Sequence, residues 1–142
     1  MIRREQLMIG DWVLVDGTPR KVETITKKKI GYHRKENEPR LYYARLQDVE
    51  PIPLEETLIL KLGFTKLNIP YLMDYDYIHA MYDIRISEES PLNNEYVLTQ
   101  YEEGGYFNFA ANKRFWTMMP IIYLHTLQHC FRLCGSNFDV KL

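Results

Sequence analysis

Four side chains of the kind that bind transition metals lie within a short stretch near the C-terminus of the chain. They are His125, His129, Cys130 and Cys134. The surrounding pattern predicts a helix over residues 120–135, and an α-helix advances about 100° per residue. The two histidines then share the polar face of the helix with Gln128 and Arg132, and the two cysteines share its apolar face. A tetrahedral site built from all four on this helix is excluded, because the ligands point to opposite sides.

The two histidines still have the i, i+4 spacing of the zinc-binding HExxH motif. The residue after His125 is Thr126, so the glutamate that acts as general base in that motif is missing. We therefore predict that the chain binds no metal. The histidines are expected to face solvent or to be hydrogen-bonded, and the two cysteines are expected to be buried thiols that pack as small apolar side chains.

Three aspartates could carry catalysis, because neighbouring carboxylates can perform acid–base chemistry or bind a hard cation. They are Asp74, Asp76 and Asp83, and they lie among tyrosines. The commoner role of such a segment is a surface for protein contact. The tyrosines expected to make that contact are Tyr71, Tyr75 and Tyr77. The chain has no GxSxG elbow, no P-loop and no GxGxxG, so we predict no catalytic residue, no cofactor and no enzymatic activity.

Basic and aromatic residues concentrate in the first fifty residues. Eleven Lys or Arg against eight Asp or Glu give this part a net charge of +3, whereas seven against eleven give the remainder −4. Basic loops with aromatic neighbours are a common nucleic-acid-binding surface of small barrels. The alternative is a set of solvated charges, and acidic residues dilute the patch. The residues expected to contact nucleic acid, if these loops bind it, are Lys27, Lys28, Lys29, Arg34, Lys35 and Tyr42.

The segment that carries these loops, residues 1–52, is expected to form several short strands. Residues 12–15 are apolar on both faces, and the Asp-Gly-Thr-Pro sequence of residues 16–19 favours a turn. Val22 and Ile25 are three residues apart rather than two, which predicts a bulge or a strong twist in the return strand. Short twisted strands with little room for helix predict an SH3-like small β-barrel.

Residues 53–142 are expected to add a helix, a sheet and a second helix. Pro53 favours a helix start, and Gly63 is placed as the left-handed cap of a helix over residues 54–62. Alternating patterns predict four strands at residues 77–87, 95–101, 106–112 and 114–119. The chain is therefore predicted to be α+β: an N-terminal SH3-like barrel, a linking helix, and an antiparallel meander packed against the C-terminal helix. We expect the two parts to form one compact unit.

Several motifs in this order resemble a family of small uncharacterised proteins of gut Bacteroidetes and of their phages and mobile elements. The matching stretches are residues 9–13 (IGDWV), 50–54 (EPIPL) and 60–64 (LKLGF), followed by Tyr123, Leu124, His125, Leu127, Gln128, Phe131, Leu133 and Gly135. The resemblance covers nearly the whole chain. It implies a phage or mobile-element origin and no enzymatic activity.

Composition sets the remaining limits on function. Hydrophobic residues at 46% and charged residues at 26% are ordinary for a globular protein, and a net charge of −1 selects no partner. No apolar run approaches the roughly 18 residues that span a bilayer, and the N-terminus lacks the apolar core of a signal peptide. We expect a small cytoplasmic, non-enzymatic interaction or accessory protein with a protein partner and no membrane contact. The alternative is a weak nucleic-acid-binding protein that uses the basic and aromatic loops of the N-terminal barrel.

Overall fold

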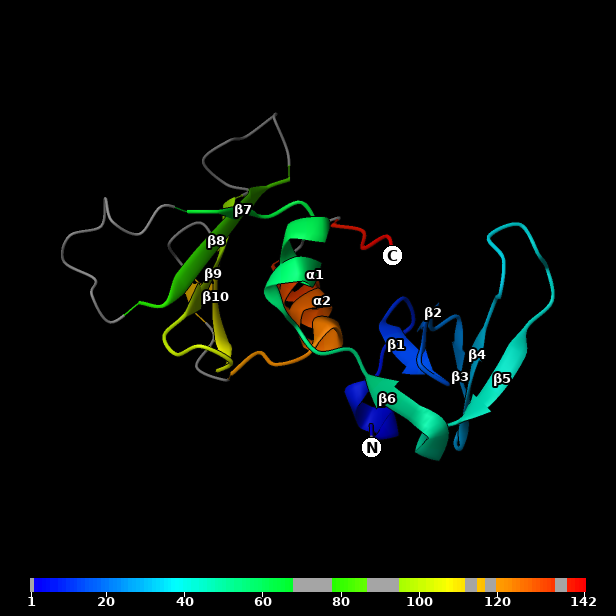
Figure 1. The fold of residues 1–142 in the computed structure, drawn as a ribbon. Coiled ribbons are helices and arrows are strands. Elements are labelled where there is room, and N and C mark those ends of the chain that lie inside the picture. Colours follow the sequence, from blue (N-terminus) through cyan, green and yellow to red (C-terminus); the bar gives the residue numbers. More distant parts are fainter. Residues whose placement is uncertain (1, 68–77, 87–94, 112–114, 117–119, 135–137) are drawn as a thin grey trace. The chain divides into compact units, whose positions relative to one another are not determined.

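The computed structural model describes six stretches of the 142-residue chain. They are residues 2–67, 78–86, 95–111, 115–116, 120–134 and 138–142. This part of the chain is α+β, as predicted, and combines antiparallel sheets with the helices α1 (Glu56–Lys61) and α2 (Leu124–Leu133) (Figure 1). Neither helix of the described residues is long and apolar enough to cross a bilayer.

The described residues form two compact units. The first comprises Met1–Pro53, Tyr123–Gln128 and Leu142, and the second comprises Leu54–Ile122 and His129–Lys141. The first break in the chain therefore lies next to the predicted boundary at residue 52. The C-terminal helix was expected to belong wholly to the second part, whereas its first half belongs to the first unit and its second half to the second.

The first unit contains two open three-stranded sheets. Its elements are η1 (Arg4–Gln6), β1 (Trp12–Val15), β2 (Thr18–Lys21), β3 (Thr24–Ile25), β4 (Lys29–Tyr32), β5 (Tyr42–Arg45), η2 (Leu46–Asp48) and β6 (Val49–Pro51). The strand orders are β2-β1-β6 and β3-β4-β5. Within the described residues no strand pairing closes these sheets into a barrel, because the edge strands β5 and β6 are joined through η2 and not by hydrogen bonds.

The predicted turn at residues 16–19 is present and joins β1 to β2 in a hairpin. The bulge or strong twist predicted from the spacing of Val22 and Ile25 stays a prediction. Asp16 and Gly17 have positive φ angles of 51° and 76°, which is the geometry that joins β1 to β2 by a two-residue turn. Beyond β2 the chain bends between adjacent residues. The Val22 N–H donates to the Asp11 carbonyl, next to β1, and the Glu23 N–H donates to the Gly31 carbonyl of β4. These adjacent residues are therefore hydrogen-bonded to different sheets. The bend lets one segment of chain supply both β2 and β3.

The buried side chains of the first unit form one core between these elements. The core residues are Ile2, Leu7, Val13, Val15, Val22, Ile30, Tyr32 and Val49. Ile25, Tyr42, Ala44 and Leu46 pack against it while remaining partly exposed. Tyr42 and Ala44 therefore face the core side of β5, and Tyr43 and Arg45 face the other side, as the alternation of a strand requires.

The second unit contains the predicted antiparallel meander. Its strands are β7 (Thr65–Lys66), β8 (Ala80–Arg85), β9 (Glu95–Gln100), β10 (Phe107–Ala111) and β11 (Phe115–Trp116), in the order β11-β10-β9-β8-β7. The four predicted strands correspond to β8 through β11. β7 was not predicted as a separate strand, because two residues are too few to show an alternating pattern.

Helix α1 ends as predicted but starts later. Gly63 has a φ of 104°, and the Phe64 N–H donates to the Ile59 carbonyl at 3.3 Å, as in a left-handed helix cap. The prediction that Pro53 begins the helix is wrong. Pro53 lies in an isolated β-bridge with Tyr123, which keeps the chain extended until the helix starts at Glu56.

Candidate nucleic-acid interface

Five side chains of the first unit form what we call the arginine–tyrosine cluster. They are Arg20, Tyr32, Arg34, Arg40 and Tyr42. Tyr32 and Tyr42 are direct cross-strand partners on β4 and β5, so their rings lie on the same face and stack with centroids 6.2 Å apart. Arg20 comes from β2, and Arg34 and Arg40 come from the two ends of the loop that joins β4 to β5.

Each arginine of the cluster lies over a tyrosine ring. The guanidinium carbon of Arg34 is 4.0 Å from the Tyr42 centroid, and that of Arg40 is 4.8 Å from the same centroid. Arg20 lies 5.4 Å from the Tyr32 centroid. All three distances fall within the range of cation–π attraction. The two stacked rings therefore gather three positive charges on one side of the first unit.

Hydrogen bonds fix the loop that carries Arg34 and Arg40. The His33 Nδ1–H donates to the Arg40 carbonyl at 2.9 Å, which joins the two ends of the loop. The Tyr42 hydroxyl donates to Glu38 Oε1 at 3.2 Å. Arg20 also donates to the Arg34 carbonyl, at 3.4 Å. The Arg20 guanidinium is thus held by a backbone carbonyl, and all three guanidinium groups lie over tyrosine rings.

The charge of the cluster is only partly balanced. None of its three arginines forms an ion pair with a carboxylate among the described residues, where Arg45–Asp48 and Lys66–Glu56 are paired. Glu38 contacts the cluster through the hydrogen bond that it accepts from the Tyr42 hydroxyl. Guanidinium groups present planar sets of donors that match phosphate oxygens. A phosphate placed among them would relieve their mutual repulsion and use their free donors.

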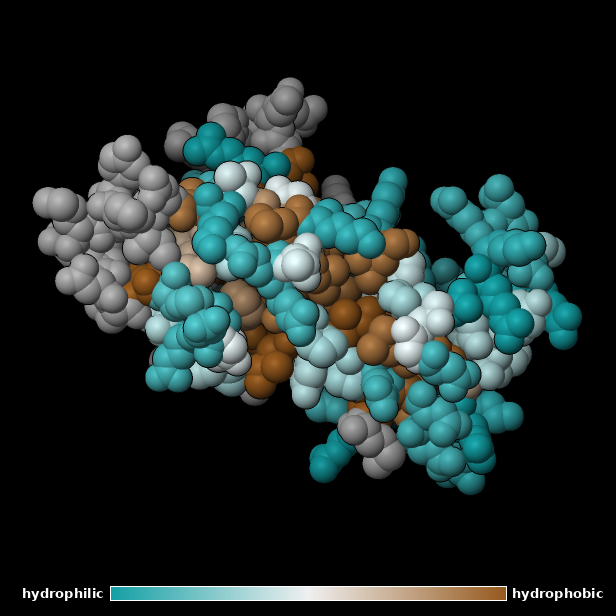
Figure 2. Space-filling model, in the orientation of Figure 1, coloured by the Kyte–Doolittle hydropathy of each residue, from teal (hydrophilic) through white to brown (hydrophobic). Residues whose placement is uncertain are grey.

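The residues predicted to bind nucleic acid fall into two groups. Arg34 and Tyr42 lie in the cluster, and Lys35 is exposed in the same loop. Lys27, Lys28 and Lys29 lie at the turn between β3 and β4, at the opposite end of β4. The side of the β3–β5 sheet that is seen in Figure 2 is mostly hydrophilic. The residues predicted from the sequence therefore include two members of the cluster, Arg34 and Tyr42, and a separate basic turn.

Three members of the cluster were missed as site residues. Tyr32 and Arg40 lie in the same basic stretch, but only the register of β4 with β5 shows that they meet Tyr42. Arg20 lies on a strand twelve residues before Tyr32, and the bend after β2 is what brings it back. The signal that could have found them is the pairing of two tyrosines across a predicted hairpin.

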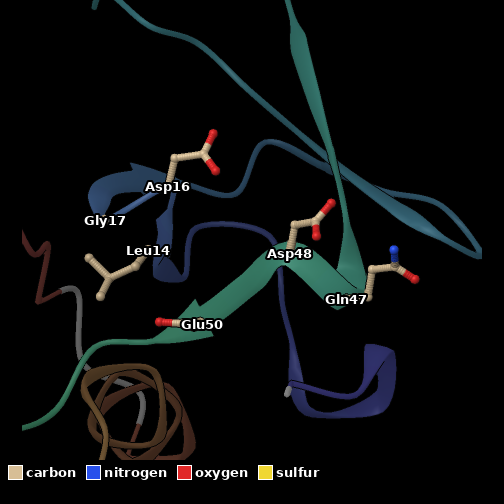
Figure 3. A pocket seen from close by; sticks show the side chains of 6 residues that line it. All are labelled: Leu14, Asp16, Gly17, Gln47, Asp48 and Glu50. Atoms are coloured by element: carbon tan, nitrogen blue, oxygen red, sulfur yellow. The ribbon is translucent and has the colours of Figure 1, made fainter.

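An acidic pocket lies elsewhere on the first unit. It has a volume of about 280 Å³ and is lined by Leu14, Asp16, Gly17, Gln47, Asp48 and Glu50 (Figure 3). The carboxylates of Asp16 and Asp48 rise to the same side of it. Asp48 is paired with Arg45 at 3.2 Å. Among the described residues no three His, Cys, Asp or Glu side chains are arranged to hold a metal ion. The negative charge of the pocket makes it unsuitable for a polyanion.

The two histidines of α2 differ in burial, and only the solvent-facing alternative of the prediction is wrong, for His125. His125 is only 6% exposed, and its ring stacks on Tyr123 with centroids 5.8 Å apart. Gln128 was also assigned to the polar face, yet it is buried. His129 is half-buried. An amphipathic pattern identifies one buried face, and the first half of α2 buries its polar face within the first unit as well.

Cys130 is buried as predicted, whereas Cys134 is half-buried and so less buried than predicted, and neither forms a disulfide. Burial raises the pKa of the Cys130 thiol to about 11 and raises the pKa of the Cys134 thiol as well. A thiol with a raised pKa holds little thiolate at neutral pH, so neither cysteine is arranged as a nucleophile.

Of the three aspartates considered for catalysis, only Asp83 lies within the described residues, on β8. Asp74 and Asp76 lie outside them, as do the predicted contact residues Tyr71, Tyr75 and Tyr77. Burial, and then the charge of Glu95, raise the pKa of Asp83 above its usual 3.8. A half-buried carboxylate near a second acid destabilises the folded protein when it is charged. By itself it is not evidence of a catalytic site.

We expect this cost to appear as a pH dependence. A raised native pKa disfavours the charged form, so stability falls as the pH rises through 3.8 and then through the native pKa. Asp83→Asn should therefore gain stability relative to the unmodified protein between pH 3 and pH 7. The gain should be only a fraction of about 1 kcal/mol, since Asp83 is partly exposed and screened. Urea titrations at pH 3 and pH 7 measure this gain in the free energy of unfolding. Asp139→Asn, at an exposed aspartate, is the matched control. An equal difference between Asp83→Asn and the unmodified protein at both pH values would contradict the prediction.

Comparisons with known proteins identify no relative of this chain, since no protein-family model, no curated protein and no solved structure matches it. The resemblance to the Bacteroidetes and phage family stays a prediction from the sequence motifs.

Proposed function

We propose that the first unit is a nucleic-acid-binding module that holds phosphate groups on the arginine–tyrosine cluster. The observation that carries the proposal is the placement of three guanidinium groups over two stacked tyrosines, none of them in an ion pair with a described carboxylate. Arginine and lysine side chains contact phosphates in such modules, and their sequence-independent attraction supplies a large share of the affinity. No described side chain forms a base-reading motif, so we propose binding with little sequence preference.

We also propose that the first unit is an SH3-like barrel that remains open. The support is the order of its strands. β2 and β3 belong to one segment bent after Lys21, so β1, β2–β3, β4 and β5 follow one another as antiparallel neighbours. The last strand, β6, then pairs back on β1. Small barrels of this kind present their loops as binding surfaces, and here the β4–β5 loop carries two of the three arginines.

A contact surface for another protein is the second candidate function. It is favoured by exposed apolar side chains of the second unit, of which Leu133 is 78% exposed. Ile122 and Leu60 are also exposed there. Capture of partners from a lysate with and without nuclease separates the candidates, because a nucleic-acid-mediated association is lost on digestion and a direct protein contact is kept.

The main prediction is a salt-dependent affinity for a single strand. We expect the full-length protein to bind a fluorescent 12-nucleotide oligonucleotide with a log–log salt slope of about −2 or steeper, because the three phosphate contacts of the cluster alone release about 0.7 counterions each. The double variant Arg34→Ala with Arg40→Ala should lower the affinity by on the order of 20-fold at 0.1 M salt and reduce the slope by about 1.4. Fluorescence anisotropy across a salt series measures both values.

The matched control removes the same charge elsewhere. Lys61→Ala with Lys141→Ala takes two exposed cations from the second unit, and it should leave both affinity and slope within about twofold of the unmodified protein. Equal losses in the two double variants would show that net charge, and not the cluster, causes binding. Absence of binding at low salt would eliminate the proposed function.

A further inference from the structure

We infer that the nucleic acid is a single strand and that one of its bases stacks on Tyr43. The inference rests on the proposed function and adds the class of ligand to it. Tyr42 cannot supply this stacking surface, since its ring already packs on Tyr32 and carries two guanidinium groups. Tyr43, the next residue of β5, faces the opposite side of the sheet and is 56% exposed.

Tyr43 lies over a glycine in the neighbouring strand. Gly31 on β4 is its direct cross-strand partner. A Cβ atom at Gly31 would stand 3.1 Å from Tyr43 Cε1 and would also collide with Thr24 Oγ1. The absence of a side chain at Gly31 therefore lets the Tyr43 ring cross the sheet directly over the backbone. The ring is supported from below and remains open to solvent.

Positive charge flanks this ring on the same face of the sheet. Lys29 and Arg45 form the neighbouring cross-strand pair, two residues from Gly31 and Tyr43 and so about 7 Å along the strands. Lys27 and Lys28 are exposed in the adjoining turn. Arg45 also contacts Asp48, in an exposed ion pair that is weak enough to share a phosphate. An aromatic ring between cations is the arrangement that binds a base and the phosphates on either side of it.

This arrangement selects a single strand over a duplex. In a duplex the faces of the bases are covered by their neighbours, so a protein ring cannot stack on them without breaking pairs. An unpaired strand offers its base faces and its phosphates together. The residues that flank Tyr43 on this face, Lys29 and Arg45, are charged, which fits a charged strand better than an apolar protein partner.

The test separates stacking from phosphate binding. Full-length protein is titrated with fluorescent 12-nucleotide DNA and RNA strands, with a DNA duplex, and with an abasic DNA strand that keeps every phosphate. Tyr43→Ala should weaken binding to the base-bearing strands by roughly fivefold to a hundredfold, the effect of losing one stacked base. The same variant should bind the abasic strand as the unmodified protein does. Tyr43→Phe should keep the affinity, and Tyr106→Ala, an exposed tyrosine of the second unit, is the matched control.

The possible outcomes distinguish failure of the stacking from failure of the proposed function. A Tyr43 effect on DNA, on RNA or on both, absent with the abasic strand, supports stacking. Equal affinity of the unmodified protein for base-bearing, abasic and duplex ligands, with no Tyr43 effect on any of them, would overturn stacking while phosphate binding stands. Absence of binding to every ligand at low salt would overturn the proposed function and the stacking together.

Discussion

Replacing Phe131 by alanine is expected to lower the free energy of unfolding by about 3–5 kcal/mol, the usual loss for a fully buried phenylalanine. Phe131 lies in the second half of α2 and is 1% exposed. Its ring touches four other aromatic rings of the second unit, at centroid distances of 4.3 Å to Phe138, 4.8 Å to Tyr96, 5.4 Å to Phe109 and 6.3 Å to Phe64. Such a set of rings cannot close the space left by the missing one.

The magnitude follows from the geometry of these contacts. Phe109 and Tyr96 meet Phe131 edge to face, with interplanar angles of 79° and 67°, an arrangement that adds to the energy of burial. An alanine at this position removes the ring from both contacts at once. Because a domain of this size has a total stability of about 5–15 kcal/mol, the variant should be near the limit of folding.

Urea denaturation followed by circular dichroism measures the loss. Leu133→Ala, two residues further along the same helix, is the matched control, because Leu133 is largely exposed. That change should stay within about 0.5 kcal/mol, as for other surface substitutions. Similar losses in the two variants would show that α2 does not bury Phe131 in the core as described.

Regular patterns explain why much of the second unit could be predicted. Alternating residues of β8, β9 and β10 bury Ala80, Tyr82, Tyr96 and Leu98 in one sheet, and a period of two appears in the sequence without knowledge of the fold. Gly63 was placed correctly as a helix cap, since a left-handed residue after an apolar helix end favours glycine. Pro53 was misplaced because its extended conformation depends on a bridge to Tyr123, seventy residues away in the chain.

The arginine–tyrosine cluster was only partly predictable for a similar reason. Arg34 and Tyr42 lie in one basic and aromatic stretch, so composition pointed to them. Arg20 joins them only after the chain has bent between Val22 and Glu23, which depends on hydrogen bonds to two separate sheets. Which of two adjacent tyrosines lies inside the cluster and which faces solvent follows from strand register, and a shift by one residue would exchange Tyr42 and Tyr43.

Gln128 shows most clearly what sequence patterning could not reveal. The helical pattern assigned it to the polar face of α2. In the structure its amide makes two hydrogen bonds to the backbone of the first unit, more than one hundred residues away in sequence. Nε2 donates to the Gly10 carbonyl at 2.9 Å, and Oε1 accepts from the Trp12 N–H at 2.9 Å. This pair of bonds fixes the first half of α2 to the start of β1.

Gln128→Ala is therefore expected to destabilise the first unit by about 2–6 kcal/mol, since two partly buried backbone groups lose their partners at about 1–3 kcal/mol each. Gln128→Glu should be nearly as harmful at pH 7, because a carboxylate can accept from Trp12 but cannot donate to Gly10. At pH 4 the protonated acid can donate, so the loss in this variant, measured against the parent at the same pH, should shrink.

The measurement uses the position of the two tryptophans. The chain has two, Trp12 in the first unit and Trp116 in the second, so a Trp116→Phe background leaves the fluorescence of Trp12 to report on the first unit. Urea titrations of this background with and without each Gln128 change give the differences. Gln47→Ala removes an exposed glutamine from the same unit and should cost under about 0.5 kcal/mol. If Gln128→Ala lowered the free energy of unfolding by as little as Gln47→Ala does, the hydrogen bonds between the Gln128 amide and β1 would contribute nothing to stability. If the loss in Gln128→Glu did not change with pH, the hydrogen bond donated to the Gly10 carbonyl would contribute nothing.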